Sequence, residues 1–425
     1  MKIAALSVFF ALGVLAQSVS LSDEPAEIEQ SAPSTDVALS SDFDIFPRPQ
    51  ILLPNIAFWR RVYGELTSNQ IIFSDAEDLS LVYRVMTVPG SGRTREQAIK
   101  QAKAEIATVL KELDACEPDS RDGLPGLAGE IYEALKDNPR EDKFRRWDFI
   151  RAQTGLKNQF REGYMRSGAH ENEIRSRLRR AGLPEELIGI VFVESLFHPK
   201  SKSSVGATGI WQFMRRTAFE YMRVNRLVDE RLDPIVSTEA AIRYIQSAKS
   251  SLVEWPLIIT SYNYGRGGMA KAAQMVGSRD FEVILKNYQN PRFGFAARNY
   301  YAEFLAAVDV YRQAKQIFPD AQPITHWAYD VIQLPKAVSV TDLLSTRAVE
   351  AVWLKTYNPA LTSFAHRGRE ILPKGFTLRV PSADRKRLEA RLAFLPERKT
   401  RKSRKRARLS TCHFTQLPTA TIMTD

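Results

Sequence analysis

The run IGIVFVESLF, residues 188–197, places one carboxylate, Glu194, among nine uncharged residues. Pro184 and the two acids after it are typical of a helix start, because proline suits the first turn and acids suit the positive end of the helix dipole. The apolar residues recur three and four positions apart, so the pattern predicts a helix with Glu194 on its buried face, near the C-terminal end. Burial disfavours the charged carboxylate, and a carboxyl group with a raised pKa suits general acid chemistry at neutral pH.

The residues after Glu194 favour this catalytic interpretation over the alternative, a structural glutamate paired with an arginine. The chain continues as HPKSKSSVGATGIWQFM, in which Gly206 and Gly209 allow another molecule to approach the backbone. Trp211 and Gln212 have the side chains that stack on a sugar and hydrogen-bond to it. This combination is typical of a loop that binds a glycan.

The sequence near Glu194 supplies no second carboxylate, since no Asp or Glu occurs between it and Glu220. Glycosidases that work with two carboxylates need the second one close to the first, as nucleophile or base. Two arrangements therefore stay open. Either Asp229, Glu230 or Asp233 folds back towards the first acid, or one glutamate serves as acid and then base, and the nucleophile is a hydroxyl of the substrate.

A further cluster, SYNYGRGGM, places Tyr262 and Asn263 just ahead of Gly265. A helix C-terminus capped by glycine, with tyrosines packed in the core, accounts for part of this pattern. It is not a phosphate-binding loop, because it lacks the preceding strand and the following Lys-Ser or Lys-Thr. Taken alone, the cluster is a weak signal for a site.

With these residues the chain resembles the family 1 lytic transglycosylases, glycoside hydrolase family 23, to which the goose-type lysozymes are related. The run VESLFHPKSKSSVGATGIWQFMRRTA is similar to the catalytic signature of that family, SYNYG to its Ala-Tyr-Asn-x-Gly motif, and ARNYYAEFLAA to the late helix that bears its tyrosine. The variant Gly-Ile-Trp-Gln-Phe-Met points to the branch of membrane-bound lytic murein transglycosylase D. That branch often carries LysM-type peptidoglycan-binding modules after the catalytic domain.

The resemblance implies a mainly α fold, with a lysozyme-like α catalytic domain, a helical N-terminal scaffold and a small β-α-α-β LysM-like module. It implies cleavage of peptidoglycan strands at the β-1,4 bond between N-acetylmuramic acid and N-acetylglucosamine, with Glu194 as acid and then base and a 1,6-anhydro product. A lysozyme-type hydrolase of the same fold and a non-catalytic peptidoglycan-binding protein are the alternatives. For substrate binding, the resemblance implies Ser203, Gln212, Tyr262, Asn263 and Tyr300.

No cofactor and no metal are expected. The five histidines never fall at the spacing of metal ligands, so a zinc site would need ligands scattered along the chain.

The N-terminal residues are typical of a secretory signal peptide. Lys2 precedes an apolar run that ends at Ala16, and this run is shorter than the roughly 20 residues needed to span a bilayer. We therefore expect an exported protein, periplasmic or secreted, that is at most peripheral to a membrane or the cell wall.

The organisation of the remaining chain is inferred from periodicity and composition. Most of the region before residue 168 has a helical pattern, including FRRWDFIRAQTGLKNQFREGYM, while QIIFSDAEDLSLVYRVMTV is compatible with strand or helix. The expected parts are a signal peptide (1–16), a flexible leader (17–44), a helical N-terminal region (45–168), the catalytic domain (169–318), the LysM-like module (325–382) and a basic, disordered tail (383–425).

The basic character of the chain is concentrated in RKTRKSRKRAR, residues 398–408. Eight of the +11 net charges lie in this segment, which leaves +3 for the rest. Such a block is typical of a solvated segment that is attracted to an anionic surface or wall polymer. No nucleic-acid partner is expected, because the chain has an export signal and lacks a nucleic-acid-binding motif.

Overall fold

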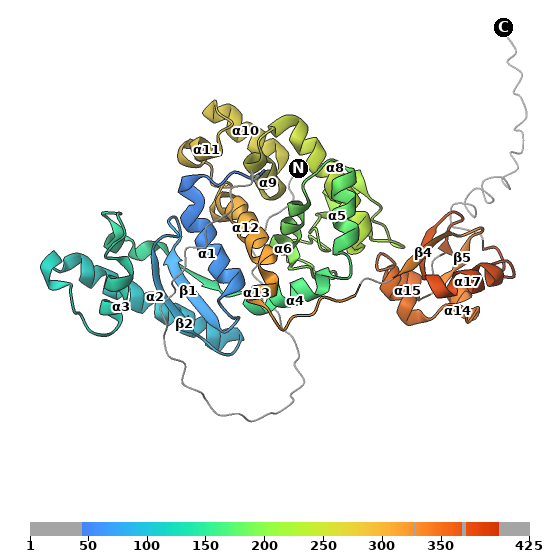
Figure 1. Ribbon diagram of the computed structural model, residues 1–425, viewed down its shortest axis with the longest axis horizontal. Helices are drawn as coiled ribbons and strands as arrows, with labels where there is room; N and C mark the ends of the chain where they lie inside the picture. The colour runs from blue at the N-terminus through green and yellow to red at the C-terminus, as the bar shows by residue number, and fades with distance from the viewer. Residues whose placement is uncertain (1–44, 326–327, 368–370, 399–425) are drawn as a thin grey trace, which may run out of the picture. The chain divides into compact units, whose positions relative to one another are not determined.

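The computed structural model of the 425-residue chain describes residues 45–325, 328–367 and 371–398, and these are mainly helical, as predicted (Figure 1). The chain divides into two compact units, and the predicted catalytic segment, 169–318, contributes to both of them. The predicted domain bounds therefore stay predictions. The first unit comprises Met1–Arg166, Arg175–Phe197 and Ile242–Gln322, and the second comprises Ser167–Ile174, His198–Ala241 and Pro323–Asp425, each considered over its described residues.

The core of the first unit is built around helix α12, Phe295–Arg312, whose residues 299–310 are all buried. Helix α1, Leu53–Gly64, lies beside it (Figure 1). A bidentate ion pair between Arg48 and Asp309 fastens the segment before α1 to α12, with N–O distances of 2.9 and 2.7 Å. The other helices of this unit are α2 Gly92–Ala115, α3 Gly126–Leu135, α6 Gly189–Ser195, α9 Trp255–Tyr264, α10 Arg266–Val276, α11 Phe281–Asn287 and α13 Ala314–Ile317.

A three-stranded antiparallel sheet with the order β2-β1-β3 belongs to the same unit. The ambiguous segment QIIFSDAEDLSLVYRVMTV forms its first two strands, β1 Gln70–Asp75 and β2 Val82–Thr87. The helix predicted across FRRWDFIRAQTGLKNQFREGYM is wrong in its middle, where β3, Ile150–Thr154, completes the sheet. Pairing with β1 overrides the local periodicity there, because the ladder satisfies the backbone groups of both strands.

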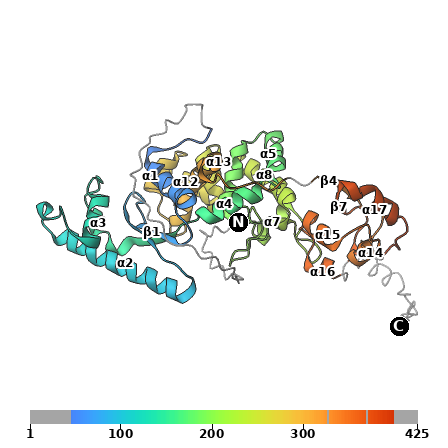
Figure 2. The same cartoon turned by 60° about the horizontal axis from the view of Figure 1, so that its bottom comes forward.

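Helices α2 and α3 cover this sheet, and Figure 2 shows α3 alongside the long α2. The three-and-four spacing of apolar residues in α2 places Ile106 and Leu110 on the face that packs against the sheet. Leu135 of α3 and Phe73 of β1 belong to the same buried cluster. The N-terminal region therefore has its own small α+β core beside α1.

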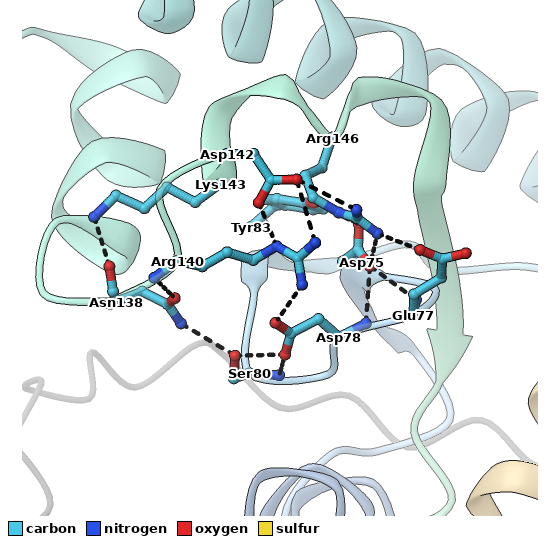
Figure 3. Close-up of polar contacts among 10 residues, drawn as sticks. All are labelled: Asp75, Glu77, Asp78, Ser80, Tyr83, Asn138, Arg140, Asp142, Lys143 and Arg146. Atoms are coloured by element: carbon cyan, nitrogen blue, oxygen red, sulfur yellow. Dashed lines mark hydrogen bonds and ion pairs between the residues drawn. The ribbon is translucent and has the colours of Figure 1, made fainter. Parts of the chain in front are cut away.

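A buried ion-pair network joins the end of β1 to the segment that leads into β3 (Figure 3). The Asp75 carboxylate is fully buried and accepts two hydrogen bonds from the Arg146 guanidinium, at 2.7 and 2.9 Å. Glu77 and Asp78 donate their backbone N–H groups to the same carboxylate, both at 2.8 Å. Tyr83 donates its hydroxyl at 3.3 Å, so Asp75 is a hub of five contacts.

The second unit contains the small β-α-α-β arrangement predicted near the C-terminus. Strand β4, Tyr329–Gln333, pairs antiparallel with β7, Thr377–Pro381, and between them lie α14, Val340–Ser345, and α15, Ala351–Tyr357. A capping box between Ser339 and Asp342 starts α14. The remaining elements of this unit are β5 Val338–Ser339, β6 Ile371–Leu372, α7 Arg215–Tyr221, α16 Ser363–His366 and α17 Arg385–Leu392.

The first part of the predicted disordered tail is folded, which corrects that prediction. Leu388 and Leu392 of α17 are buried in the core of the C-terminal module, defined here as the described residues between 328 and 398. Their spacing of four places both on one helix face, and this face packs on the module. The run of positive charge continues beyond Arg398, outside the described residues. The predicted signal peptide and leader also lie outside the described residues.

Three helices begin in one unit and end in the other along the chain: α4 Lys157–Ser167, α5 Glu171–Arg180 and α8 Pro234–Leu252. Short 3-10 turns link several elements, and they are Gln50–Leu52, Pro118–Ser120, Lys143–Arg145, Trp147–Phe149, Glu185–Ile188, Glu230–Leu232 and Ser382–Asp384. None of the helices that the structure describes is long and apolar enough to cross a membrane.

Candidate active site

Glu194 lies in the last turn of α6, in the helix predicted from Pro184 and the apolar spacing. The helix stops sharply, because Leu196 and Phe197 both have left-handed backbone conformations, with φ of 47° and 57°. The turn is held from outside by Arg166, which donates a hydrogen bond of 2.9 Å to the Leu196 carbonyl. The backbone on the C-terminal side of the carboxylate is therefore fixed.

The Glu194 carboxyl accepts a hydrogen bond of 2.6 Å from the hydroxyl of Tyr300 on α12. Burial raises the pKa of Glu194 to about 8, although the hydrogen bond from Tyr300 acts in the opposite direction by favouring the ionised form. Part of the side chain remains accessible to solvent. Glu194 is thus mostly protonated at neutral pH and still within reach of a bound molecule.

Tyr262 and Asn263 lie in the last turn of α9, which ends at Gly265 with a φ of 88°. The predicted glycine-capped helix end is therefore confirmed. Tyr262 is buried and packs edge-on against Tyr244, with ring centroids 5.5 Å apart. Its pKa is raised by burial and by the charge of Glu194, which places its hydroxyl in the electrostatic environment of that acid.

A second buried acid, Glu303, lies on α12 one helical turn after Tyr300. Burial is the largest cause that raises its pKa to about 8; the charge of Glu194 adds to the rise, and Arg151 opposes it. Glu303 was not predicted from the sequence, because only Asp229, Glu230 and Asp233 were considered as second carboxylates. The available signal was an acid three positions after Tyr300 in the apolar run ARNYYAEFLAA.

Arg151 of β3 is the cation whose charge acts on Glu303. Its guanidinium lies 3.7 Å from the ring centroid of Phe295, and burial lowers its pKa while the charge of Glu303 raises it. The hydroxyl of Tyr63 on α1 also lies in this environment, since its pKa is raised by burial, by Glu303 and by Glu194. The N-terminal sheet thus contributes a positive charge to the surroundings of Glu303.

Ser203 and Gln212 lie in the second unit, in a loop formed by residues 201–213 and called the 201–213 loop below. The Ser203 hydroxyl accepts a hydrogen bond of 2.9 Å from the N–H of Ala207. Gln212 has a left-handed backbone and donates to the carbonyls of Ser201 and Gly209, at 3.2 and 2.7 Å. Both side chains organise the loop. That they line one groove with Glu194 stays a prediction.

Trp211 does not stack on a sugar, which corrects that expectation. Its side chain is completely buried, and its indole N–H donates a hydrogen bond of 2.8 Å to the hydroxyl of Thr238 on α8. A large aromatic side chain with its polar atom satisfied gains more from the core than from the surface. Trp211 therefore anchors the 201–213 loop to the protein.

Each of the three candidate bases has an arginine partner in the second unit. Asp229 pairs with Arg231 at 2.8 Å, and Glu230 pairs with Arg223 at 2.6 Å. Asp233 pairs with Arg379, and it also accepts hydrogen bonds from the first backbone N–H groups of α8. The three carboxylates therefore have structural roles in and around the segment that follows α7.

The two raised carboxyl pKa values predict that folding stability falls as pH rises. Above the ordinary value of 4.5 these groups ionise in the unfolded chain, whereas Glu303 keeps its proton in the folded protein up to a pKa of about 8. Their contribution to the free energy of unfolding is complete below pH 4.5. It falls as pH rises from 4.5 to 8, by at most about 1.4 kcal/mol per group and pH unit. Glu303→Gln should flatten this dependence in urea unfolding at pH 5 and pH 8. The exposed control Glu220→Gln should leave the wild-type slope, and an equal slope in both variants would contradict the assignment.

Residues 171–285 match the family described as the Transglycosylase SLT domain. This segment contains the predicted site residues Glu194, Ser203, Gln212, Tyr262 and Asn263. The match confirms the family resemblance drawn from the motifs. Residues 171–285 are thus similar to the transglycosylase SLT domain.

Two curated relatives, both "Membrane-bound lytic murein transglycosylase D" from strains of Escherichia coli, are 26% identical to this chain over 189 residues. The aligned part covers 44% of this chain and only 41% of each relative's length. Among solved structures, an inactive mutant of the lytic transglycosylase Slt from Pseudomonas aeruginosa is 22% identical, with a TM-score of 0.29, over 37% of this chain and 26% of that chain.

Proposed function

We propose that this protein is a lytic transglycosylase that cleaves peptidoglycan strands between N-acetylmuramic acid and N-acetylglucosamine. The observation that carries the proposal is the Glu194 carboxyl, which has a pKa raised to about 8 by burial, is partly accessible and accepts a hydrogen bond from Tyr300. The SLT match of residues 171–285 supports the substrate class. A protonated acid of this kind is what departure of a glycosidic oxygen requires.

In the first step Glu194 donates its proton to the glycosidic oxygen, and the bond from that oxygen to the muramoyl anomeric carbon breaks. The glutamate is then ionised, and the Tyr300 hydroxyl at 2.6 Å stabilises the new charge. In the second step the carboxylate takes the proton of the muramoyl C6 hydroxyl, whose oxygen closes onto the anomeric carbon. The product is a 1,6-anhydro end, and Glu194 regains its proton.

A hydrolase of the same fold is the second candidate, and Glu303 is the observation that raises it. Its carboxyl shares the electrostatic environment of Glu194, so it is a candidate for the base that activates a water molecule. A base must be ionised, however, and a pKa of about 8 leaves Glu303 mostly protonated at neutral pH. The single-glutamate cycle is therefore the better supported route.

Mass spectrometry of the products tests the proposal directly. Purified sacculi are incubated with the protein, and the soluble muropeptides are compared with those released by a lysozyme. We expect 1,6-anhydro ends without net uptake of water. Products with reducing ends would support the hydrolase instead, and sacculi that bind the protein without releasing fragments would indicate a non-catalytic binder.

The proposed partners are peptidoglycan strands, bound at the SLT domain and at the C-terminal module, which we interpret as a LysM-like wall-binding unit. The proposed location is periplasmic or secreted, after removal of residues 1–16. The basic segment 398–408 would add attraction to an anionic lipid surface or wall polymer. Ser203, Gln212, Tyr262 and Asn263 are the proposed contacts to the sugar.

A further inference from the structure

We propose that the C-terminal module is a structural support of the 201–213 loop, with Arg231 as the positioning residue between them. The inference rests on the proposed glycan cleavage, in which this loop contacts the sugar. It gives the module a role in catalysis that is separate from binding to the wall. The contacts that connect the module to the loop all lie within the second unit.

The module pairs with the segment before Arg231 through its backbone. The N–H of Asp229 donates to the carbonyl of Ala360 at 2.8 Å, and the N–H of Thr362 donates to the carbonyl of Leu227 at 3.1 Å. Val228 forms an antiparallel bridge with Leu361 between these two bonds. The two stretches therefore meet like a short pair of strands, which fixes their register.

Buried side chains strengthen the same seam. Val228 belongs to the hydrophobic core of the module, together with Leu361. Arg379 of β7 forms an ion pair with Asp233, a residue that is only 4% exposed and caps α8. Removal of one partner from such a buried pair leaves an uncompensated charge, so this contact constrains where the module can lie.

Arg231 transmits this placement to the 201–213 loop. Its guanidinium is bidentate to the Asp229 carboxylate, at 2.9 and 2.8 Å, and also donates to the carbonyls of Gly206 and Phe213, at 3.0 and 3.1 Å. The carbonyl oxygen of Arg231 lies so close to Gly209 that an added Cβ would be 1.7 Å away. Only the planar fork of arginine satisfies these acceptors together.

The consequence is that the module, through Asp229 and Arg231, sets the backbone of a loop that is proposed to bind the substrate. Catalytic rates depend on substrate placement, and an error of about 1 Å can lower a rate about a hundredfold. A module that only anchors the enzyme to the wall would affect cleavage of sacculi and leave short soluble glycans unaffected. A supporting module affects both.

The test compares two full-length variants on sacculi and on soluble glycan strands of four to six sugars. Arg379→Met breaks the buried seam, whereas Arg385→Met removes an exposed arginine of the same module that pairs with Glu389 at 3.1 Å. We expect Arg379→Met to lower kcat on the short glycans about tenfold or more, and Arg385→Met to stay within about twofold of wild type. Loss on sacculi alone would identify an anchor and overturn the proposal.

A second measurement tests the support without relying on activity, so it also applies if a variant folds poorly or if the wild-type protein does not cleave glycan. Amide hydrogen exchange reports on the hydrogen bonds inside the loop, from the N–H of Thr208 to Phe213 and from the N–H of Gly209 to Ser201. In Arg379→Met and in Arg231→Lys these amides should exchange faster than in wild type, whereas those of α12 should exchange as in wild type. If wild type is inactive but this exchange rises, the proposed function fails and the support stands. Unchanged exchange in both folded variants overturns the support.

Discussion

Glu194→Gln is expected to lower glycan cleavage at least about a hundredfold, because the variant has no proton to give to the glycosidic oxygen. The amide has the size of the acid, and its oxygen can still accept the hydrogen bond that Tyr300 makes at 2.6 Å. The fold and the affinity for glycan should therefore be preserved, and the loss should appear in kcat. Release of soluble muropeptides from purified sacculi measures it.

Glu220→Gln is the matched control, since it makes the same chemical change at an exposed position. It should cleave sacculi like wild type. The general acid assignment fails if Glu194→Gln keeps more than about a hundredth of the wild-type rate while its urea unfolding is unchanged. Tyr300→Phe serves as a companion, because it leaves the acid in place and removes the hydrogen bond to its ionised form.

The local part of the site could be predicted from the sequence because it depends on neighbours along the chain. The start of the helix after Pro184, the apolar stripe and the position of Glu194 near its end all follow from spacing within about a dozen residues. Its pKa shift followed from the same reasoning, since burial on an apolar face has one direction for a carboxylate.

The distant part could not be predicted in this way. Tyr300 lies 106 residues after Glu194, and only the family resemblance suggested that the two lie together. The influence of Arg151 on Glu303 was not predicted, because Arg151 lies in β3, where the local periodicity favours a helix. Such a pairing depends on β1, which lies about 80 residues earlier in the chain.

Trp211 illustrates a different limit. An aromatic residue in a glycine-rich loop is equally compatible with a sugar-stacking surface and with a core anchor, because both use the same ring. The hydroxyl of Thr238, which satisfies the indole N–H, belongs to a helix that begins 23 residues later. Burial of this kind is decided by tertiary packing and is not visible in the residues around the loop.

Asp75→Asn is expected to destabilise the protein by about 3–5 kcal/mol, because it leaves the buried Arg146 guanidinium without its counter-charge. The carboxylate is fully buried and also holds the turn after β1 through two backbone N–H groups at 2.8 Å (Figure 3). Urea unfolding at neutral pH measures the change as a lower midpoint with an unchanged slope.

Glu77→Gln is the control for that network, because it removes a negative charge from the same Arg146 at a position whose side chain is 63% exposed. It should cost less than about 1 kcal/mol, as exposed ion pairs usually do. Equal losses in the two variants would mean that the network acts through its total charge and not through the buried Asp75.

The network also matters for the candidate site, because Asp75 pairs in register with Ile150 at the start of β3, one residue before Arg151. Loosening this end of the sheet should therefore release Arg151, whose charge acts on Glu303. The pH dependence of the free energy of unfolding between pH 5 and pH 8 should then differ from wild type in Asp75→Asn, as it should in Glu303→Gln.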